Sequence, residues 1–103
     1  MRRPGSARVD TFRAMRTASA DLLAVRTVTV DGSDVYLRVT ASPVDLEIRW
    51  SRDGEHRGSP VLFPAGDRSR RLLGTGFRAG TTFCLDVVGE TGQAWCGVVD
   101  WNV

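Results

Sequence analysis

The chain has 103 residues, of which 42% are hydrophobic and 25% charged, and its formal net charge is +2. These values are those of a soluble globular domain of ordinary composition, so they exclude a disordered or membrane-embedded chain and predict one domain. The small net charge gives no indication of nucleic-acid binding, and no apolar run approaches the roughly 18 residues of a membrane-spanning helix.

Residues 1–26 are predicted to be an N-terminal extension, and residues 27–103 the domain itself. Pro4 and Gly5 in an arginine-rich start indicate a disordered tail. From Asp10 or Thr11, either of which is a suitable helix cap, apolar residues recur every three or four positions and predict one or two helical turns. These apolar positions are Val9, Phe12, Met15, Ala18, Leu22 and Val25. The segment either docks on the domain's own core or binds a partner, a membrane surface or a second copy.

Beyond Arg26 the apolar residues recur every second position, which predicts half-buried β-strands. The first strand contains Val28 and Val30, a turn follows at residues 31–33, and further strands cover residues 35–40 and 45–52. Trp50 falls on the apolar side of the last of these strands and is expected in the core.

Asp53-Gly54 is a strong signal for a two-residue type I′ hairpin turn. The return arm covers residues 55–63, where Pro60 cannot donate a ladder hydrogen bond and so predicts an edge strand. A loop at residues 64–67 and a short strand at residues 70–73 follow. Short strands at this spacing predict an all-β sandwich.

Residues 83–101 alternate in two runs around a Gly-Glu-Thr-Gly turn and predict a final hairpin. Phe83, Leu85 and Val87 share the core-facing side of the first arm, and Trp95, Val99 and Trp101 share that of the second. Cys84 and Cys96, the only cysteines, then point the same way on the outer face. They stand within reach of a disulfide if the turn centres near Glu90, and are offset if the turn shifts by one residue.

A Cys84–Cys96 disulfide is the favoured interpretation of this pair, and it would add about 3 kcal/mol of stability by closing a loop of about 13 residues. Two unpaired thiols are the alternative. A zinc site lacks ligands, because His56 is the sole histidine, and a redox pair normally has the Cys-x-x-Cys spacing. No metal site, cofactor or catalytic residue is therefore expected.

The cellular compartment is open from the sequence. A disulfide predicts a secreted or cell-surface protein, whereas the N-terminus lacks the apolar core of a secretory signal and predicts a cytoplasmic protein if Met1 is the true start and the thiols are free. All 14 basic residues are arginine, a bias that indicates a GC-rich bacterial genome such as that of an actinobacterium.

The sequence from Ile48 to Trp101 resembles the second half of a fibronectin type III domain. A strand that ends in a charged turn is followed by an edge strand, a short strand, a corner motif and a final hairpin. The positions of the corner motif are held by Phe77, Ala79, Gly80, Thr81 and Phe83. The resemblance, which extends over residues 28–103, implies a small immunoglobulin-like (fibronectin type III-like) antiparallel β-sandwich and carries over no catalytic residue.

The sequence contains no convergent set of catalytic groups, since His56 follows a tight turn and has no adjacent nucleophile. We therefore expect a non-catalytic binding module rather than an enzyme. The candidate binding face is the outer face of the sheet that contains the final hairpin, where an Arg49–Asp86 contact is a simple surface ion pair. The face comprises Glu47, Arg49, Asp86, Val88, Val98 and Asp100.

A protein partner is expected. A cell-wall glycan is a further possibility, for which Tyr36 and Trp101 are the available aromatic rings. Two alternatives remain open: a small secreted inhibitor of a hydrolase such as a protease, and an assembly subunit that forms a homo-oligomer through residues 9–25. The candidate binding loops are residues 78–82 and the hairpin turn with Asp53, Gly54, His56 and Arg57.

Overall fold

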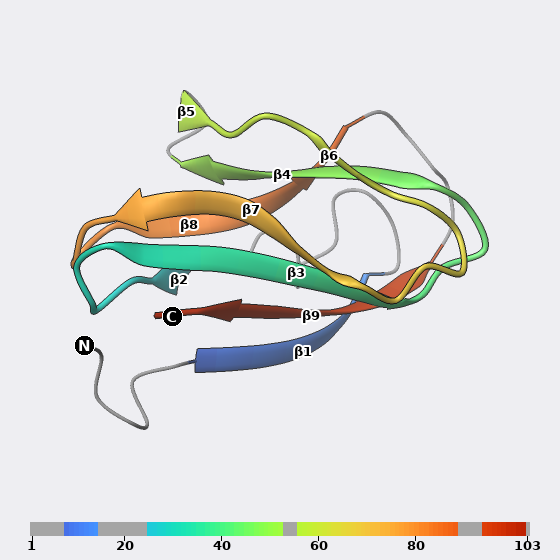
Figure 1. Ribbon diagram of the computed structural model, residues 1–103, viewed down its shortest axis with the longest axis horizontal. Coiled ribbons are helices and arrows are strands. Elements are labelled where there is room, and N and C mark those ends of the chain that lie inside the picture. The colour runs from blue at the N-terminus through green and yellow to red at the C-terminus, as the bar shows by residue number, and fades with distance from the viewer. Residues whose placement is uncertain (1–7, 15–24, 53–55, 89–93, 103) are drawn as a thin grey trace.

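The computed structural model describes residues 8–14, 25–52, 56–88 and 94–102 (Figure 1). The described residues form nine strands and no helix, and therefore include no helix that could cross a membrane. The strands are β1 (Arg8–Ala14), β2 (Arg26–Thr27), β3 (Ser33–Ala41), β4 (Leu46–Arg52), β5 (His56–Arg57), β6 (Val61–Phe63), β7 (Arg70–Phe77), β8 (Thr82–Val87) and β9 (Trp95–Trp101).

The strands build two antiparallel sheets that face each other, which confirms the expected all-β sandwich. Sheet A has the strand order β1-β9-β3-β7, and sheet B has the order β2-β8-β4-β5, with β6 also paired to β4. Apart from the run β4 to β6, each described strand is followed in sequence by a strand of the other sheet. The chain therefore crosses repeatedly between the two layers.

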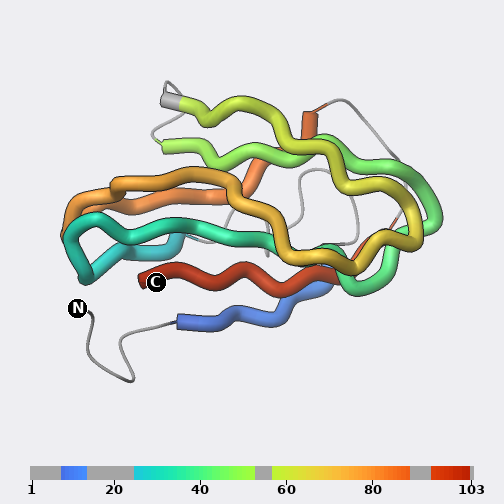
Figure 2. The backbone as a smooth tube through the Cα atoms, in the orientation of Figure 1, coloured from blue at the N-terminus to red at the C-terminus, as the bar shows by residue number. Residues whose placement is uncertain are grey.

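The pairing follows a nested pattern in which early strands pair with late ones. β1 pairs with β9, β2 with β8, β3 with β7, and β4 with β5 and β6. These pairs correspond to one long hairpin folded in half near β4 and β5. The hairpin is also rolled up on itself, and this brings β3 beside β9 and β4 beside β8. With β5 and β6 taken as one interrupted strand, this is the strand order of a jelly roll. Figure 2 shows that the first and the last strand, β1 and β9, lie side by side as a result.

The core lies between the sheets and is filled by the alternate residues of each strand. The burial pattern of β9 alternates strictly between buried and half-buried residues, and that of β8 between half-buried and buried ones. All six residues predicted to face the core from these strands are buried: Phe83, Leu85, Val87, Trp95, Val99 and Trp101. Alternation in the sequence therefore identified the core faces correctly.

The prediction of a helix from Asp10 or Thr11 is wrong as far as residue 14, because these residues belong to β1, an edge strand of sheet A. Val9 and Phe12 are three positions apart, so they share a helix face but lie on opposite faces of a strand. Phe12 is buried against the ring of Trp95, whereas Val9 is 67% exposed. Val25, the last apolar position of the predicted helix, is described, belongs to no helix or strand and is 66% exposed. Residues 15–24 of the predicted helix, and residues 1–7 of the predicted tail, lie outside the described residues.

The predicted final hairpin is wrong, because β8 and β9 belong to different sheets. Cys84 and Cys96 are therefore on the outer faces of opposite layers of the sandwich, and the expected Cys84–Cys96 disulfide is not formed. The fibronectin type III resemblance implies a hairpin at this point, so this strand order does not support it. The expectation of secretion rested on the same disulfide and loses that support.

The β4–β5 hairpin is confirmed, with Arg52 opposite His56 in the register of the two strands. The turn residues Asp53 and Gly54 lie outside the described part of the chain. The return arm is interrupted around Pro60, between β5 and β6, as expected.

Trp50 is half-buried and packs against the core from β4. Its indole lies in a narrow space beside Gly74 of β7 and Gly58, whose backbone N–H donates to the carbonyl of Trp50 at 3.0 Å. A Cβ atom on Gly74 would approach the indole Nε1 to 2.7 Å, closer than real contacts allow. The edge of the indole thus fills the seam where β7 of sheet A meets the edge of sheet B.

Candidate functional site

The predicted binding face does not exist as one surface. Glu47, Arg49, Asp86 and Val88 belong to sheet B or its end, whereas Val98 and Asp100 are on β9 of sheet A. The predicted Arg49–Asp86 pair is confirmed, with Arg49 Nε 2.7 Å from Asp86 Oδ2 and the two residues opposite each other in the β4–β8 register. The outer face of sheet B therefore includes an ordinary cross-strand ion pair.

The outer face of sheet A is the broader candidate surface. Residues that stand opposite one another in register share a face of the sheet, and two such rows cross all four strands. One row is Val9, Asp100, Tyr36 and Leu72, and the next is Thr11, Val98, Arg38 and Arg70. We call these eight residues, together with Arg13 and Cys96, the A face.

Arg70 dominates the polar contacts of the A face. Its guanidinium stacks on the Tyr36 ring, 3.6 Å from the ring centroid, and its Nε lies 3.1 Å from Asp100 Oδ2. The hydrogen bond to Asp100 is the main reason that the pKa of Arg70 is raised. The stack also covers one face of Tyr36, and Trp101 is buried with its indole N–H donated to the carbonyl of Thr27. One face of the Tyr36 ring and the buried Trp101 indole are therefore not available to stack on a sugar.

Arg38 stands directly opposite Arg70 in the β3–β7 register. Like charges in this position destabilise a sheet, and Arg70 is already paired with Asp100. Arg38 is exposed, and among the described residues it has no acidic partner; the same is true of Arg13 on β1. The A face therefore presents two uncompensated cations beside the aliphatic side chains of Val9, Val98 and Leu72.

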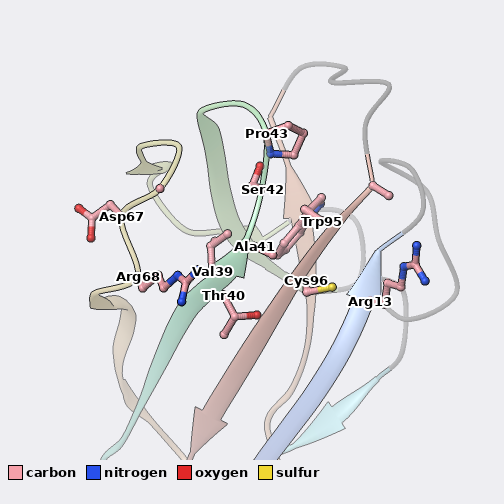
Figure 3. Close-up of a pocket in the computed structure, with 12 residues that line it drawn as sticks. Arg13, Val39, Thr40, Ala41, Ser42, Pro43, Asp67, Arg68, Trp95 and Cys96 are labelled. Atoms are coloured by element: carbon pink, nitrogen blue, oxygen red, sulfur yellow. The ribbon is translucent and has the colours of Figure 1, made fainter.

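At one end of the A face lies a pocket of about 500 Å³, which we call the end pocket (Figure 3). Its floor is made by the ends of β3 and β9, and its sides by the end of β1, by residues 42–43 and by the loop of residues 66–68. The lining residues are Arg13, Val39, Thr40, Ala41, Ser42, Pro43, Gly66, Asp67, Arg68, Ala94, Trp95 and Cys96. In Figure 3 the two arginines stand on opposite sides of β3 and β9.

The loop that carries Arg68 is held by Asp67. The Asp67 carboxylate accepts hydrogen bonds from the Ser69 backbone N–H at 2.9 Å and from the Ser69 hydroxyl at 2.7 Å, and it also pairs with Arg71 Nη2 at 2.5 Å. These bonds, the backbone one first, lower the pKa of Asp67 from 3.8 to about 2. Gly66 has φ of 79° and allows the turn in which the Asp67 N–H donates to the Pro64 carbonyl.

Other features of the described residues add little chemistry to the end pocket. Trp95 is buried and its Nε1 has no hydrogen-bond partner in the described part of the chain. No group of three histidine, cysteine or acidic residues, among those described, is placed to hold a metal ion. Of the predicted hairpin-loop residues, His56 and Arg57 form β5, and Arg57 is exposed.

Sequence reasoning missed Arg13, Arg38, Arg68 and Arg70 as possible binding residues. They come from three separate segments, around Arg13, around Arg38 and at residues 68–70, which only the long-range strand pairing brings close together. The outward position of Tyr36 in an alternating strand was the available signal, because an exposed aromatic ring commonly attracts an arginine.

Comparisons with known proteins found no relative. No protein-family model matches the chain, and neither the curated proteins nor the solved structures include a significant match.

Proposed function

We propose that the protein is a non-catalytic binding module that holds a protein partner against the A face. The observation that carries the proposal is the combination of exposed aliphatic side chains with arginines that lack an acidic partner among the described residues. Val9 is 67% exposed and Leu72 44% exposed, and Arg13 and Arg38 lie on the same face. Aliphatic area favours association once it is removed from water, and the uncompensated cations select a partner with acidic side chains.

The experiment that tests this proposal is selection from a random peptide display library with the purified protein as bait. We expect enrichment of peptides that combine acidic and aliphatic residues, and their loss on the Val98→Asp and Arg38→Glu variants. The matched controls on the other sheet are Leu62→Asp and Arg57→Glu, which likewise replace an aliphatic residue and an arginine by an acidic residue, at exposed positions. Enriched peptides that bind all four variants equally, or no enrichment at all, would rule out the A face.

Inhibition of a hydrolase is a second candidate, supported by the turn at residues 78–82. The Ala79 N–H donates to Asp31 Oδ1 at 2.8 Å, the Gly80 N–H donates to the Val28 carbonyl at 2.7 Å, and the Val28 N–H donates to the Thr81 carbonyl. Arg78 is thus exposed on a turn that is already held in place, and such a turn loses little entropy on binding. Inhibition of a trypsin-like protease that disappears in Arg78→Ala would favour this function over the first.

Self-assembly through residues 9–25 is a third possibility and is separated from the others by size in solution. Residues 9–14 of this segment already lie in the chain's own sheet A, paired with β9. Sedimentation over a range of protein concentrations that shows a monomer throughout excludes assembly, whereas a concentration-dependent increase in mass supports it.

A further inference from the structure

We propose that the end pocket binds a small organic anion, with a carboxylate or phosphate group attracted by the positive charges of Arg13 and Arg68 at the pocket sides and an apolar body on the pocket floor. This goes beyond the proposed partner binding, since it concerns a small ligand at one end of the sandwich and does not require a protein partner. The charge of the pocket, its shape and the fixed loop at its side support the proposal independently.

The charge of the pocket is the first argument. Arg13 and Arg68 both line it, both are exposed, and neither has an anionic partner among the described residues. The carboxylate nearest in sequence to Arg68 is its neighbour Asp67, which is bound to Ser69 and Arg71 instead. Arg68 therefore remains available, and the planar guanidinium is the side-chain group best matched to a carboxylate or phosphate.

The shape of the pocket is the second argument. A volume of about 500 Å³ lies within the usual range of pockets that take small organic molecules, roughly 300–1,000 Å³. Much of the lining between the two arginines is apolar, from Val39, Ala41 and Pro43. An apolar lining with a few charged groups at its sides selects an amphiphilic anion over a bare inorganic ion.

The fixed geometry of the pocket sides is the third argument. The Ser42 hydroxyl donates to the Val44 carbonyl at 2.7 Å and accepts from the Val44 N–H at 3.3 Å, which holds the turn at Pro43. At another side of the pocket, the Asp67 hydrogen bonds hold the loop next to Arg68. A pocket whose sides are already ordered loses less entropy when a ligand binds.

The test is a titration of the ¹⁵N-labelled protein with benzoate and, separately, with phenyl phosphate, followed by NMR at about 0.15 M salt to screen non-specific attraction. We expect saturable shifts at Thr40, Ala41, Cys96 and the Trp95 indole N–H, and none with benzyl alcohol, which has the same ring without the charge. The relative affinities for the two probes show whether the carboxylate or the phosphate group is preferred.

The variants Arg13→Gln and Arg68→Gln are each expected to weaken binding about tenfold, since each removes a positive charge that attracts the anion to the pocket. The matched controls are Arg8→Gln on the same strand as Arg13, and Arg57→Gln on sheet B; both should bind as the wild type does. The dispersion of each spectrum shows that the variant is folded.

Three outcomes overturn the proposal: no saturable shift with either anion, equal binding of benzyl alcohol, or equal loss of binding in all four arginine variants. The Val98→Asp variant, which tests the A face, is expected to keep its affinity for the anion. The variants therefore show separately whether the A face binds a protein partner and whether the end pocket binds an anion.

Discussion

Arg26 and Asp10 form an ion pair that joins the first strands of the two sheets. The Arg26 Nε donates to Asp10 Oδ2 at 3.0 Å, and Nη2 lies 2.9 Å from the same oxygen. The Arg26 side chain is only 4% exposed, whereas that of Asp10 is 43% exposed, and the guanidinium also lies over the Phe12 ring, 5.6 Å from its centroid. The pair thus ties β2 of sheet B to the edge strand of sheet A.

Asp10→Ala is expected to lower the free energy of unfolding by about 1–3 kcal/mol, because it removes an anionic partner from a buried cation. The value is below that of a fully buried pair because Asp10 is partly solvated. Glu47→Ala, an acidic residue on an exposed part of β4, is the control and should change stability by no more than about 0.5 kcal/mol. Equal effects of the two substitutions in urea unfolding would show that the pair contributes nothing.

Gly74→Ala is expected to destabilise the protein by about 1–3 kcal/mol through overpacking, since its Cβ would lie 2.7 Å from Trp50 Nε1 and 2.9 Å from Phe77 Cζ. Trp50→Leu in the same chain should recover part of this loss, which a double-mutant cycle measures. Gly76→Ala is the contrasting variant, because Gly76 has φ of 72° and open space around it. Its loss of stability should come from the backbone alone and should not be recovered by Trp50→Leu.

Because of Asp67, the free energy of unfolding should depend on pH in the acidic range. Its pKa is about 2 in the folded protein against 3.8 for the ordinary carboxyl, so the ionised form stabilises the fold above pH 3.8 and this contribution is lost as the pH falls through about 2. The wild type should therefore be more stable than Asp67→Asn at about pH 5, and the difference should narrow towards pH 2. Glu47→Gln serves as the control for the change in net charge. A stability difference between the wild type and Asp67→Asn that stays constant from pH 5 to pH 2 would contradict the lowered pKa of Asp67.

Reduction should leave the unfolding midpoint unchanged. A Cys84–Cys96 bridge would contribute about 3 kcal/mol, but the two residues lie on opposite sheets. Thermal unfolding with and without reductant, together with the Cys96→Ser variant, measures this. A large drop on reduction that Cys96→Ser reproduces would show that the strand assignment of β8 or β9 is wrong.

The sequence predicted which residues face the core better than it predicted which strands pair. Alternation is a local property, so Phe83 and Trp95 were placed inward correctly. The same alternation arises whether two successive strands form a hairpin or cross between sheets, and nothing local in residues 83–101 distinguishes the two. The end pocket was missed for a related reason, because Arg13 and Arg68 line the same pocket only through the pairing of β1, β9, β3 and β7.

The nested strand pairing also sets an order in which the chain can fold. The β4–β5 hairpin closes the shortest loop, with Arg52 opposite His56, and short loops lose the least entropy on closure. Once it has formed, β3 and β7 are held close together, and each further pair closes a loop that the pairs inside it have already shortened. Folding can therefore proceed from the middle of the sequence outwards, more quickly than the separation of β1 from β9 along the chain would indicate. In this order, the contact between Arg8 and Trp101 at the two ends of the described chain is the last to form and the first to open.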